Sequence, residues 1–312
     1  MRIFKNRGDI YMPSTKFKSD LEQKILLGIL AFIIFFTAVF LLVFGIKYNF
    51  SAKEFFAPND MKTEQADVAD QLPAVSGKTN FLLVLSNKST DEMLLCAIFQ
   101  ADMDTVSYKA CTLAPNTQTE SGKLAEIYKS SGAAGVVNSV NKLIGIDIDY
   151  YIDESYEDYK KMFDSMGSVT YTVLNDVKYK DTDKYGYNIK IKAGDQKIDG
   201  DNAEKLLRYY VTQEKNFSAA NDLLLAAASQ HMNDTNFENR ESLFSKMIEL
   251  SKTNITVKDF TDNLNNLKVL SSSTTGVSVY SAAAQYDGDE LTSSSIGDIL
   301  GYFATVSYTH LT

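Results

Sequence analysis

The pattern of apolar and polar positions begins with one long hydrophobic segment. Residues 25–46 contain no charged side chain, and as a helix they are long enough to cross a bilayer of roughly 30 Å. The pattern therefore predicts a transmembrane helix. Positive residues are concentrated before this segment, at Arg2, Lys5, Arg7, Lys16, Lys18 and Lys24, whereas only Lys47 and Lys53 follow closely. The positive-inside rule then places the N-terminus in the cytoplasm and the rest of the chain outside it.

A polar stretch separates this segment from a globular region. It contains Pro58 and Pro73 and is typical of a linker. The final residues do not continue the helical pattern before them and resemble the ends of conceptual translations, so their native origin stays open. We divide the chain into a cytoplasmic tail at 1–24, a transmembrane helix at 25–46, an extracytoplasmic linker at 47–78, a folded domain at 79–305 and a C-terminal tail at 306–312.

The first half of the folded domain alternates strand and helix patterns. Apolar, β-leaning runs predict strands at 81–85, 93–99, 105–113, 148–152 and 169–173. Apolar residues at helical spacing predict helices at 133–144 and 154–166. Such alternation is typical of an α/β layered fold, and the opening hairpin of three strands indicates a mixed sheet.

Helix patterns dominate the second half. They predict helices at 201–211, 217–232 and 241–251, a strand at 276–282 and a closing helix from residue 293. The predicted fold class is α/β, with a mixed central sheet flanked by helices and preceded by one transmembrane helix.

Composition narrows the classes of function. The formal net charge of −9 and the shortage of arginine argue against a nucleic-acid partner. The two cysteines, Cys96 and Cys111, lie in adjacent predicted strands on the oxidising side of the membrane. A disulfide and two buried free thiols both remain open at this point.

The common catalytic motifs are absent. The sequence contains no HExxH, CxxC, Walker or GxSxG motif. His231 ends an apolar helix, which indicates a packing role. Asp147, Asp149 and Asp153 alternate around the run IDYYI, and we interpret them as loop ends and one solvent-facing side of a strand rather than as metal ligands.

The order of elements and several motifs resemble the LytR-CpsA-Psr family of cell-envelope proteins. The resemblance rests on NFLLVL, TDEMLL, TVSYKACTLAPNT, the segment around LIGIDIDYYI, and KIDGDNAEKLLRYY, and it spans roughly 79–300. It implies an extracytoplasmic α/β domain anchored in the membrane. The activity implied is magnesium-assisted transfer of a glycopolymer from a polyprenyl-pyrophosphate carrier onto peptidoglycan.

Several positions depart from the family pattern. The turn after the third strand has Pro115 and Asn116 where the family has an arginine and a metal-binding aspartate. Tyr210 replaces a second arginine, and Ala219 and Asp222 replace two more in the following helix. These are the degenerate positions of the predicted site.

Three residues match the family pattern. The resemblance implies substrate binding by Arg208 and Lys123 and metal binding by Asp91, with Arg208 the one candidate catalytic residue. Each also has a structural interpretation: Arg208 follows Glu204 by four helical positions, as a surface ion pair would, while Asp91 suits a turn and Lys123 suits solvent.

Two hypotheses of function follow. The first is a membrane-anchored extracytoplasmic envelope protein that binds or regulates polyprenyl-linked glycopolymer without catalysis and without a cofactor. The second is a divergent phosphotransferase that uses magnesium to attach glycopolymer to peptidoglycan. Losing one charge donor typically costs about 10²- to 10³-fold in rate, so several losses favour the first. Both place the protein in the cell membrane as a single-pass chain.

Overall fold

The computed structural model describes residues 72–181, 186–272 and 277–304. The predicted transmembrane helix at 25–46, most of the predicted linker and the tail at 306–312 lie outside these ranges. Within them, no helix combines the length and apolar character needed to cross a membrane.

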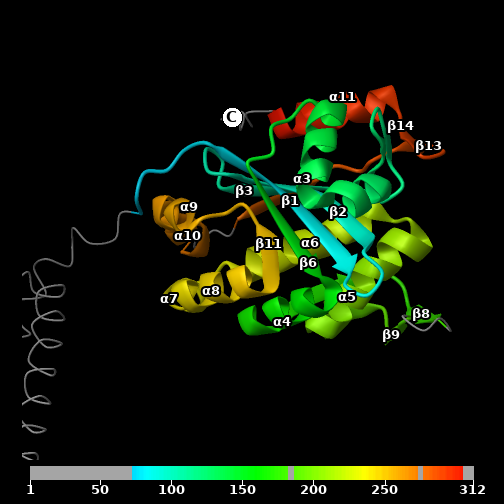
Figure 1. Ribbon diagram of the computed structural model, residues 1–312. Coiled ribbons are helices and arrows are strands. Elements are labelled where there is room, and N and C mark those ends of the chain that lie inside the picture. The colour runs from blue at the N-terminus through cyan, green and yellow to red at the C-terminus, as the bar shows by residue number, and fades with distance from the viewer. Residues whose placement is uncertain (1–71, 182–185, 273–276, 305–312) are drawn as a thin grey trace, which may run out of the picture. The chain divides into compact units, whose positions relative to one another are not determined.

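A mixed sheet of six strands forms the centre of the domain, in the order β11-β6-β1-β2-β3-β12 (Figure 1). The strands are β1 (Lys78–Asn87), β2 (Glu92–Asp102), β3 (Ser107–Leu113), β6 (Tyr150–Ser155), β11 (Ser251–Thr253) and β12 (Ser278–Ser281). β1, β2 and β3 form an antiparallel meander, β6 is parallel to β1, and β12 is parallel to β3. The predicted mixed sheet is confirmed.

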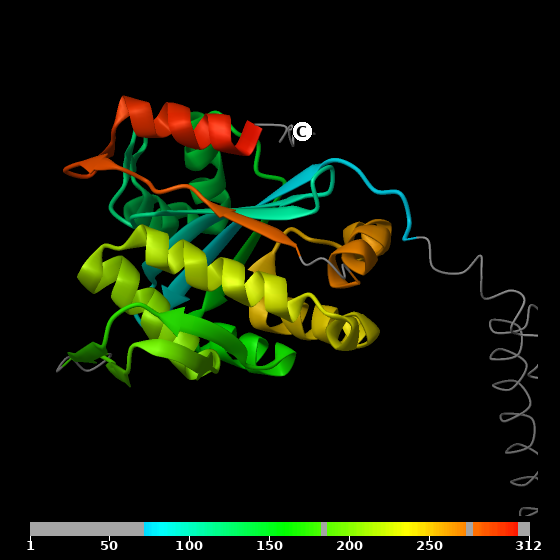
Figure 2. The ribbon, with the colours of Figure 1, turned by 180° about the vertical axis from the view of Figure 1, so that it is seen from behind.

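Helices cover both faces of the sheet, as Figures 1 and 2 show. One face carries α3 (Leu124–Ile144) and α11 (Ser293–Ala304), and the other carries α4 (Tyr156–Met166), α5 (Gly200–Arg208), α6 (Phe217–His231) and α8 (Arg240–Leu250). Side chains alternate across each strand, so Leu82 and Val84 pack toward α3 while Leu85 packs toward α4 and α6. This alternation gives the domain a separate apolar core on each side of the sheet.

The predicted helices are present with changed ends. The helix predicted at 133–144 begins earlier, at Leu124, and is kinked at Gly132. The helix predicted at 201–211 ends as α5 at Arg208, and the chain continues as a π-helical stretch at Tyr209–Glu214. α5 also packs very closely on α4, since a Cβ at Gly200 would lie 2.3 Å from the Lys160 carbonyl oxygen.

The sequence pattern did not predict a set of short elements. They are β4 (Gln118–Thr119), β5 (Gly122–Lys123), β8 (Val177–Lys180), β9 (Asn188–Ile191), β10 (Gly194–Ile198), β13 (Tyr286–Asp287), β14 (Glu290–Leu291), α7 (Asp234–Glu238), α9 (Val257–Asp262) and α10 (Leu264–Ser271). β10 pairs with β7 (Val169–Val173), which was predicted, and β8 pairs with β9. β8, β9 and β10 are rich in Lys, Asn, Asp and Gln, and they therefore lack the apolar runs on which the prediction relied.

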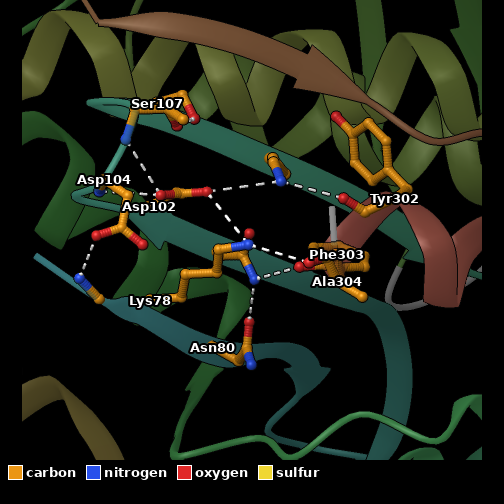
Figure 3. Close-up of polar contacts among 12 residues, drawn as sticks. Lys78, Asn80, Asp102, Asp104, Ser107, Tyr302, Phe303 and Ala304 are labelled. Carbon is orange, nitrogen blue, oxygen red and sulfur yellow. Dashed lines mark hydrogen bonds and ion pairs between the residues drawn. The ribbon is translucent and has the colours of Figure 1, made fainter. Parts of the chain in front are cut away.

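Two lysines, the partly exposed Lys78 and the buried Lys109, hold the end of α11 against the start of the sheet (Figure 3). Lys78 Nζ donates to the Ala304 carbonyl oxygen at 3.2 Å, and Lys109 Nζ donates to that of Tyr302 at 3.1 Å. Asp102 is fully buried and lies 3.6 and 3.7 Å from the two ammonium groups. The two cations thus satisfy carbonyl groups at a helix C-terminus, where positive charge is favoured.

The two cysteines are buried free thiols. Cys96 pairs in register with Leu113 and Cys111 with Ile98, so the cysteines are diagonal rather than direct cross-strand neighbours. Burial raises the pKa of each thiol to about 12. Both side chains therefore act as small apolar residues in the core on the α3 side.

One interpretation of the acidic residues around IDYYI was wrong. The strand predicted at 148–152 is shifted and forms β6, which continues to Ser155. Asp153 consequently lies inside the strand and is buried, and its Oδ1 accepts a hydrogen bond from the Tyr128 hydroxyl at 2.8 Å. It does not face solvent, because α3 covers that face of the sheet.

Candidate functional site

The candidate site lies at the edge of the sheet where β1, β3 and β6 end. These three strands run in the same direction, since β3 is antiparallel to β2 and β2 to β1. Loops at the carboxyl ends of such strands are a common place for ligand sites in α/β folds. The turn containing Asp91 and the turn containing Pro115 and Asn116 both lie at this edge.

The turn after β3 is held by neutral hydrogen bonds. The Ala114 amide donates to the Tyr286 hydroxyl at 2.8 Å, and that hydroxyl lies 2.9 Å from Thr117 Oγ1. Pro115 is half-buried and Asn116 is exposed. The turn is therefore well fixed, but its side chains provide neither a cation for phosphate nor a carboxylate for a metal.

Asp91 closes the turn between β1 and β2. Its φ of +52° is left-handed, and its amide donates to the Asn87 carbonyl oxygen at 2.9 Å. The side chain is exposed. Across the described ranges, no three His, Cys, Asp or Glu side chains lie close enough together to hold a metal. A magnesium site needs several oxygen ligands, so the residues around Asp91 do not fit one.

Lys123 takes part in a local ion pair. It immediately precedes α3, and its Nζ lies 2.8 Å from Asp289 Oδ2, in the turn between β13 and β14. The hydrogen bond to Asp289 raises the pKa of the lysine. Both side chains are partly exposed, so solvent screens this pair and its contribution to stability is small.

Arg208 is enclosed by its neighbours. Its Nε and Nη2 lie 2.7 and 2.5 Å from the same Glu204 oxygen, Oε1. The rings of Tyr156 and Tyr187 lie 4.5 and 4.2 Å from the guanidinium carbon, which is cation–π distance. The ion pair indicated by the spacing is present, but it is buried, with Arg208 only 9% exposed, rather than at the surface. Glu204 therefore balances the charge that would bind a phosphate.

The degenerate positions supply no replacement cation. Tyr210 and Ala219 are buried in the core on the α4 and α6 side, and Asp222 is exposed on α6. Within the described part of the chain, no hydrogen bond or ion pair joins Asp91, Lys123 and Arg208 to one another. The structure thus holds the three retained residues in separate local contacts.

A large apolar cavity lies between the sheet and the helices on the α4 side. Its volume is about 480 Å³, within the range of 300–1,000 Å³ that is usual for small-molecule sites. The walls include residues of β1, β2, β6, α4, α6, α8, α9 and α10, with aromatic side chains such as Phe81, Phe99, Phe163 and Phe260. Apolar residues recur at strand spacing along the sheet and at helical spacing along the helices, and these two apolar faces form the cavity. The residues at the sheet edge are not part of its walls.

A buried acidic side chain, that of Glu154, lies in this apolar wall. Glu154 is 4% exposed and lines the cavity near the carboxyl end of β6. Burial, together with the nearby Asp158 and Asp153, raises the pKa of its carboxyl to about 8. At the opposite end of α4, His231 also lines the cavity, where its Nε2 lies 2.7 Å from the Gly167 carbonyl oxygen and its ring packs on Phe163. The predicted packing role of His231 is confirmed.

Sequence reasoning missed Glu154, the burial of Glu204 and the two tyrosines around Arg208. The signal for Glu154 was its even spacing from Tyr150 and Ile152, which places all three on one face of a strand. The signal for a buried Glu204 was its position between Ala203 and Leu206 on an apolar helix face. Tyr187 belongs to a polar segment whose pattern indicated no element.

Comparison with known proteins identifies the family. The model of the LytR_cpsA_psr family matches residues 77–296, most of the chain. The chain belongs to the LytR-CpsA-Psr family. A search of curated protein sequences found no match.

Solved structures share the fold at low identity. A protein from Eubacterium siraeum, described as a transcription regulator, is 19% identical with a TM-score of 0.65, covering 76% of this chain and 95% of its own. TagV of B. subtilis is 16% identical with a TM-score of 0.58, over 74% of this chain and 97% of TagV. TagT bound to LI-WTA is 14% identical with a TM-score of 0.55, over 75% and 93%. Such likeness supports the LytR-CpsA-Psr fold.

Proposed function

We propose that this LytR-CpsA-Psr protein is a membrane-anchored, extracytoplasmic envelope protein that binds polyprenyl-linked glycopolymer without transferring it. The observation that carries the proposal is the apolar cavity of about 480 Å³ beside a sheet edge whose phosphate-binding cations are missing or paired. An apolar cavity suits the lipid part of a carrier. A related protein, TagT, has been solved bound to LI-WTA, which supports a ligand of this class.

The lack of free charge at the sheet edge argues against transfer. Phosphoryl-type chemistry depends on cations that stabilise negative charge on the reacting phosphates. Arg208 is balanced by Glu204, Lys123 by Asp289, and the turn after β3 provides Asn116 where a metal carboxylate is expected. The alternative function, a divergent magnesium-dependent phosphotransferase, would have to break both ion pairs before it could bind pyrophosphate.

Binding and turnover can be measured on the same preparation. Full-length protein in amphipol is mixed with a polyprenyl-pyrophosphate glycopolymer, peptidoglycan and magnesium. We expect saturable binding of the lipid and no release of polyprenyl phosphate above the protein-free rate. Release of polyprenyl phosphate by the unmodified protein above the protein-free rate would establish the transferase instead. If the protein does not bind the lipid at all, both the binding function and the transferase function are excluded.

A rebuilt site provides the positive control. The combined variant Pro115→Arg, Asn116→Asp and Asp222→Arg restores charge at three positions that are at least partly exposed and can accept it. Ala219 is left unchanged because its side chain is buried. Groups that act together in a site are strongly non-additive, so we expect any gain in turnover only in the combination and not in the single variants.

The membrane anchor is a separate part of the proposal. Protease added to intact cells should digest the domain beginning near residue 79 and leave the segment at 25–46 in the membrane. A domain that is protected in intact cells and cleaved only after lysis would overturn the extracytoplasmic placement. Full release of the domain by mild washing would overturn the anchor.

A further inference from the structure

One buried carboxyl group, that of Glu154, lines the cavity near the carboxyl end of β6. Glu154 lies on the same face of the sheet as Leu83, Leu85 and Ile152, because β1 and β6 pair with Leu85 opposite Glu154. Within the described residues, neither a hydrogen-bond donor nor a cation contacts its side chain. An unpartnered buried carboxyl is costly for a fold, so its presence in a ligand cavity needs an explanation.

The other charged groups around Glu154 are acidic or belong to other contacts. Asp158 on α4 and Asp153 on β6 are the charges that act on it. Glu204 on α5, like Glu154, contributes to raising the pKa of Tyr159, but it is paired with Arg208. Lys252 on β11 pairs in register with Asp153, whereas Glu154 pairs with the neighbouring Ser251. No neighbouring cation therefore balances an ionised Glu154.

The remaining titratable groups of the cavity wall hold one charge state between pH 7 and 9. Burial raises the pKa of Tyr108, Tyr150 and Tyr159, so the three hydroxyls stay neutral. Burial lowers the pKa of His231, which is neutral as well. Asp259 also lines the wall, and hydrogen bonds from Thr256 lower the pKa of its carboxyl, so it stays charged. A change in the charge of the wall over this range thus comes from Glu154.

We propose that Glu154 sets which head-group charge the cavity accepts: with its proton it admits a lipid carrying a singly anionic phosphodiester, and when ionised it rejects that lipid. This inference rests on the proposed function, since it assumes that the cavity holds the lipid chain. The protonated carboxyl can donate a hydrogen bond to a phosphate oxygen. The ionised carboxylate has no donor and repels the anion at short range in an apolar site.

The test compares two isoprenoid probes that differ in charge. Geranylgeranyl methyl phosphate carries one negative charge throughout pH 7–9, whereas geranylgeraniol is neutral. Their affinities for full-length protein in amphipol are measured by displacement of a dansyl-labelled isoprenoid at pH 7, 8 and 9. Because one proton is lost from a group with a pKa of about 8, the affinity for the phosphodiester should fall about tenfold from pH 7 to 9. The affinity for the alcohol should stay within about twofold.

Two variants assign the effect to Glu154. Glu154→Gln keeps the shape and hydrogen-bonding capacity of the protonated form, so its affinity for the phosphodiester should not depend on pH. Asp153→Asn changes the adjacent acid on the opposite face of the sheet and should keep the fall, with a lower midpoint because one neighbouring charge is gone. Unchanged affinity for geranylgeraniol verifies that each variant is folded.

The outcomes separate the inference from the proposed function. A fall of equal size in Glu154→Gln, or no fall in the unmodified protein, would overturn the role of Glu154 while leaving lipid binding in place. Failure of both probes to bind the unmodified protein at any pH would overturn lipid binding itself and the inference with it.

Discussion

Replacement of Arg208 by alanine should destabilise the domain strongly. The change leaves Glu204, which is 2% exposed, without the one cation that contacts it among the residues the structure describes, and one of its oxygens already has no hydrogen-bond partner. Removing one partner of a buried ion pair typically costs about 3–5 kcal/mol. The two cation–π contacts with Tyr156 and Tyr187 are also lost, at about 0.5–2 kcal/mol each, although these terms overlap. We therefore expect Arg208→Ala to lower the free energy of unfolding by about 4 kcal/mol at pH 7.

The pH dependence of this loss has a definite sign. Burial raises the pKa of Glu204 in the folded protein, and Arg208 opposes that rise. Without the arginine, the folded-state pKa rises further above the unfolded value. A carboxyl group whose pKa is higher in the folded than in the unfolded state stabilises the fold fully below its unfolded-state pKa. This contribution is lost as the pH rises toward its folded-state pKa. Arg208→Ala should thus be more destabilising at pH 8 than at pH 5.

Urea unfolding followed by far-ultraviolet circular dichroism measures these differences, and the same helix supplies a control. Lys205 pairs with Asp201 on α5, but both side chains are partly exposed, so Lys205→Ala should cost less than about 1 kcal/mol. The double variant Glu204→Gln with Arg208→Met should recover much of the loss because it leaves no buried charge. If Arg208→Ala lowers the free energy of unfolding no more than Lys205→Ala does, the arginine is not needed for stability. A role in ligand binding then becomes the better explanation.

Three further predictions concern other parts of the fold. Since Glu154 has a folded-state pKa of about 8, unfolding free energy should decline between pH 5 and 8, and Glu154→Gln should remove roughly 3–5 kcal/mol of that decline in urea titrations at each pH. Gly200→Ala should cost about 1–3 kcal/mol because its Cβ meets the Lys160 carbonyl, whereas Gly297→Ala, in open space on α11, should be neutral or slightly stabilising in thermal unfolding. Asp102→Asn removes a buried carboxylate that lies close to both Lys78 and Lys109 at the end of α11, so amide hydrogen exchange at Tyr302 and Phe303 should quicken while that in α4 stays unchanged.

The sequence predicted those elements whose apolar pattern is uninterrupted. β1, β2 and β3 appear where alternating or continuous apolar runs were read, and α4 and α6 begin within two residues of their predicted positions. The end of β6 was misplaced because Asp153 and Glu154 look like the start of a polar loop. Their burial follows from tertiary contacts, with Tyr128 on one face and the cavity on the other, and a single sequence does not reveal these contacts.

The sequence predicted where the residues of the candidate site lie, but not which side chains they contact. Motif matching placed Asp91, Pro115 and Asn116 in turns, and the structure brings these turns to one edge of the sheet. Motif matching could not show that Lys123 pairs with Asp289, which is distant in the sequence, or that the Tyr187 ring packs on Arg208. Long-range pairs of this kind depend on the packing of segments whose own patterns are weak.

The cavity and the sheet edge depend on different physical features, which explains how one can outlast the other. The cavity is produced by strand alternation and helix periodicity, so any sequence that keeps these apolar faces keeps a lipid-sized space. The sheet edge depends on single charges, each of which can be removed or neutralised by one substitution. Here Arg208 stays in the chain but is paired with Glu204 one helical turn earlier, and Asp222 stands where the resemblance to the family implies an arginine. The proposed function, in which a LytR-CpsA-Psr domain binds a lipid chain without transferring its glycopolymer, is consistent with this difference.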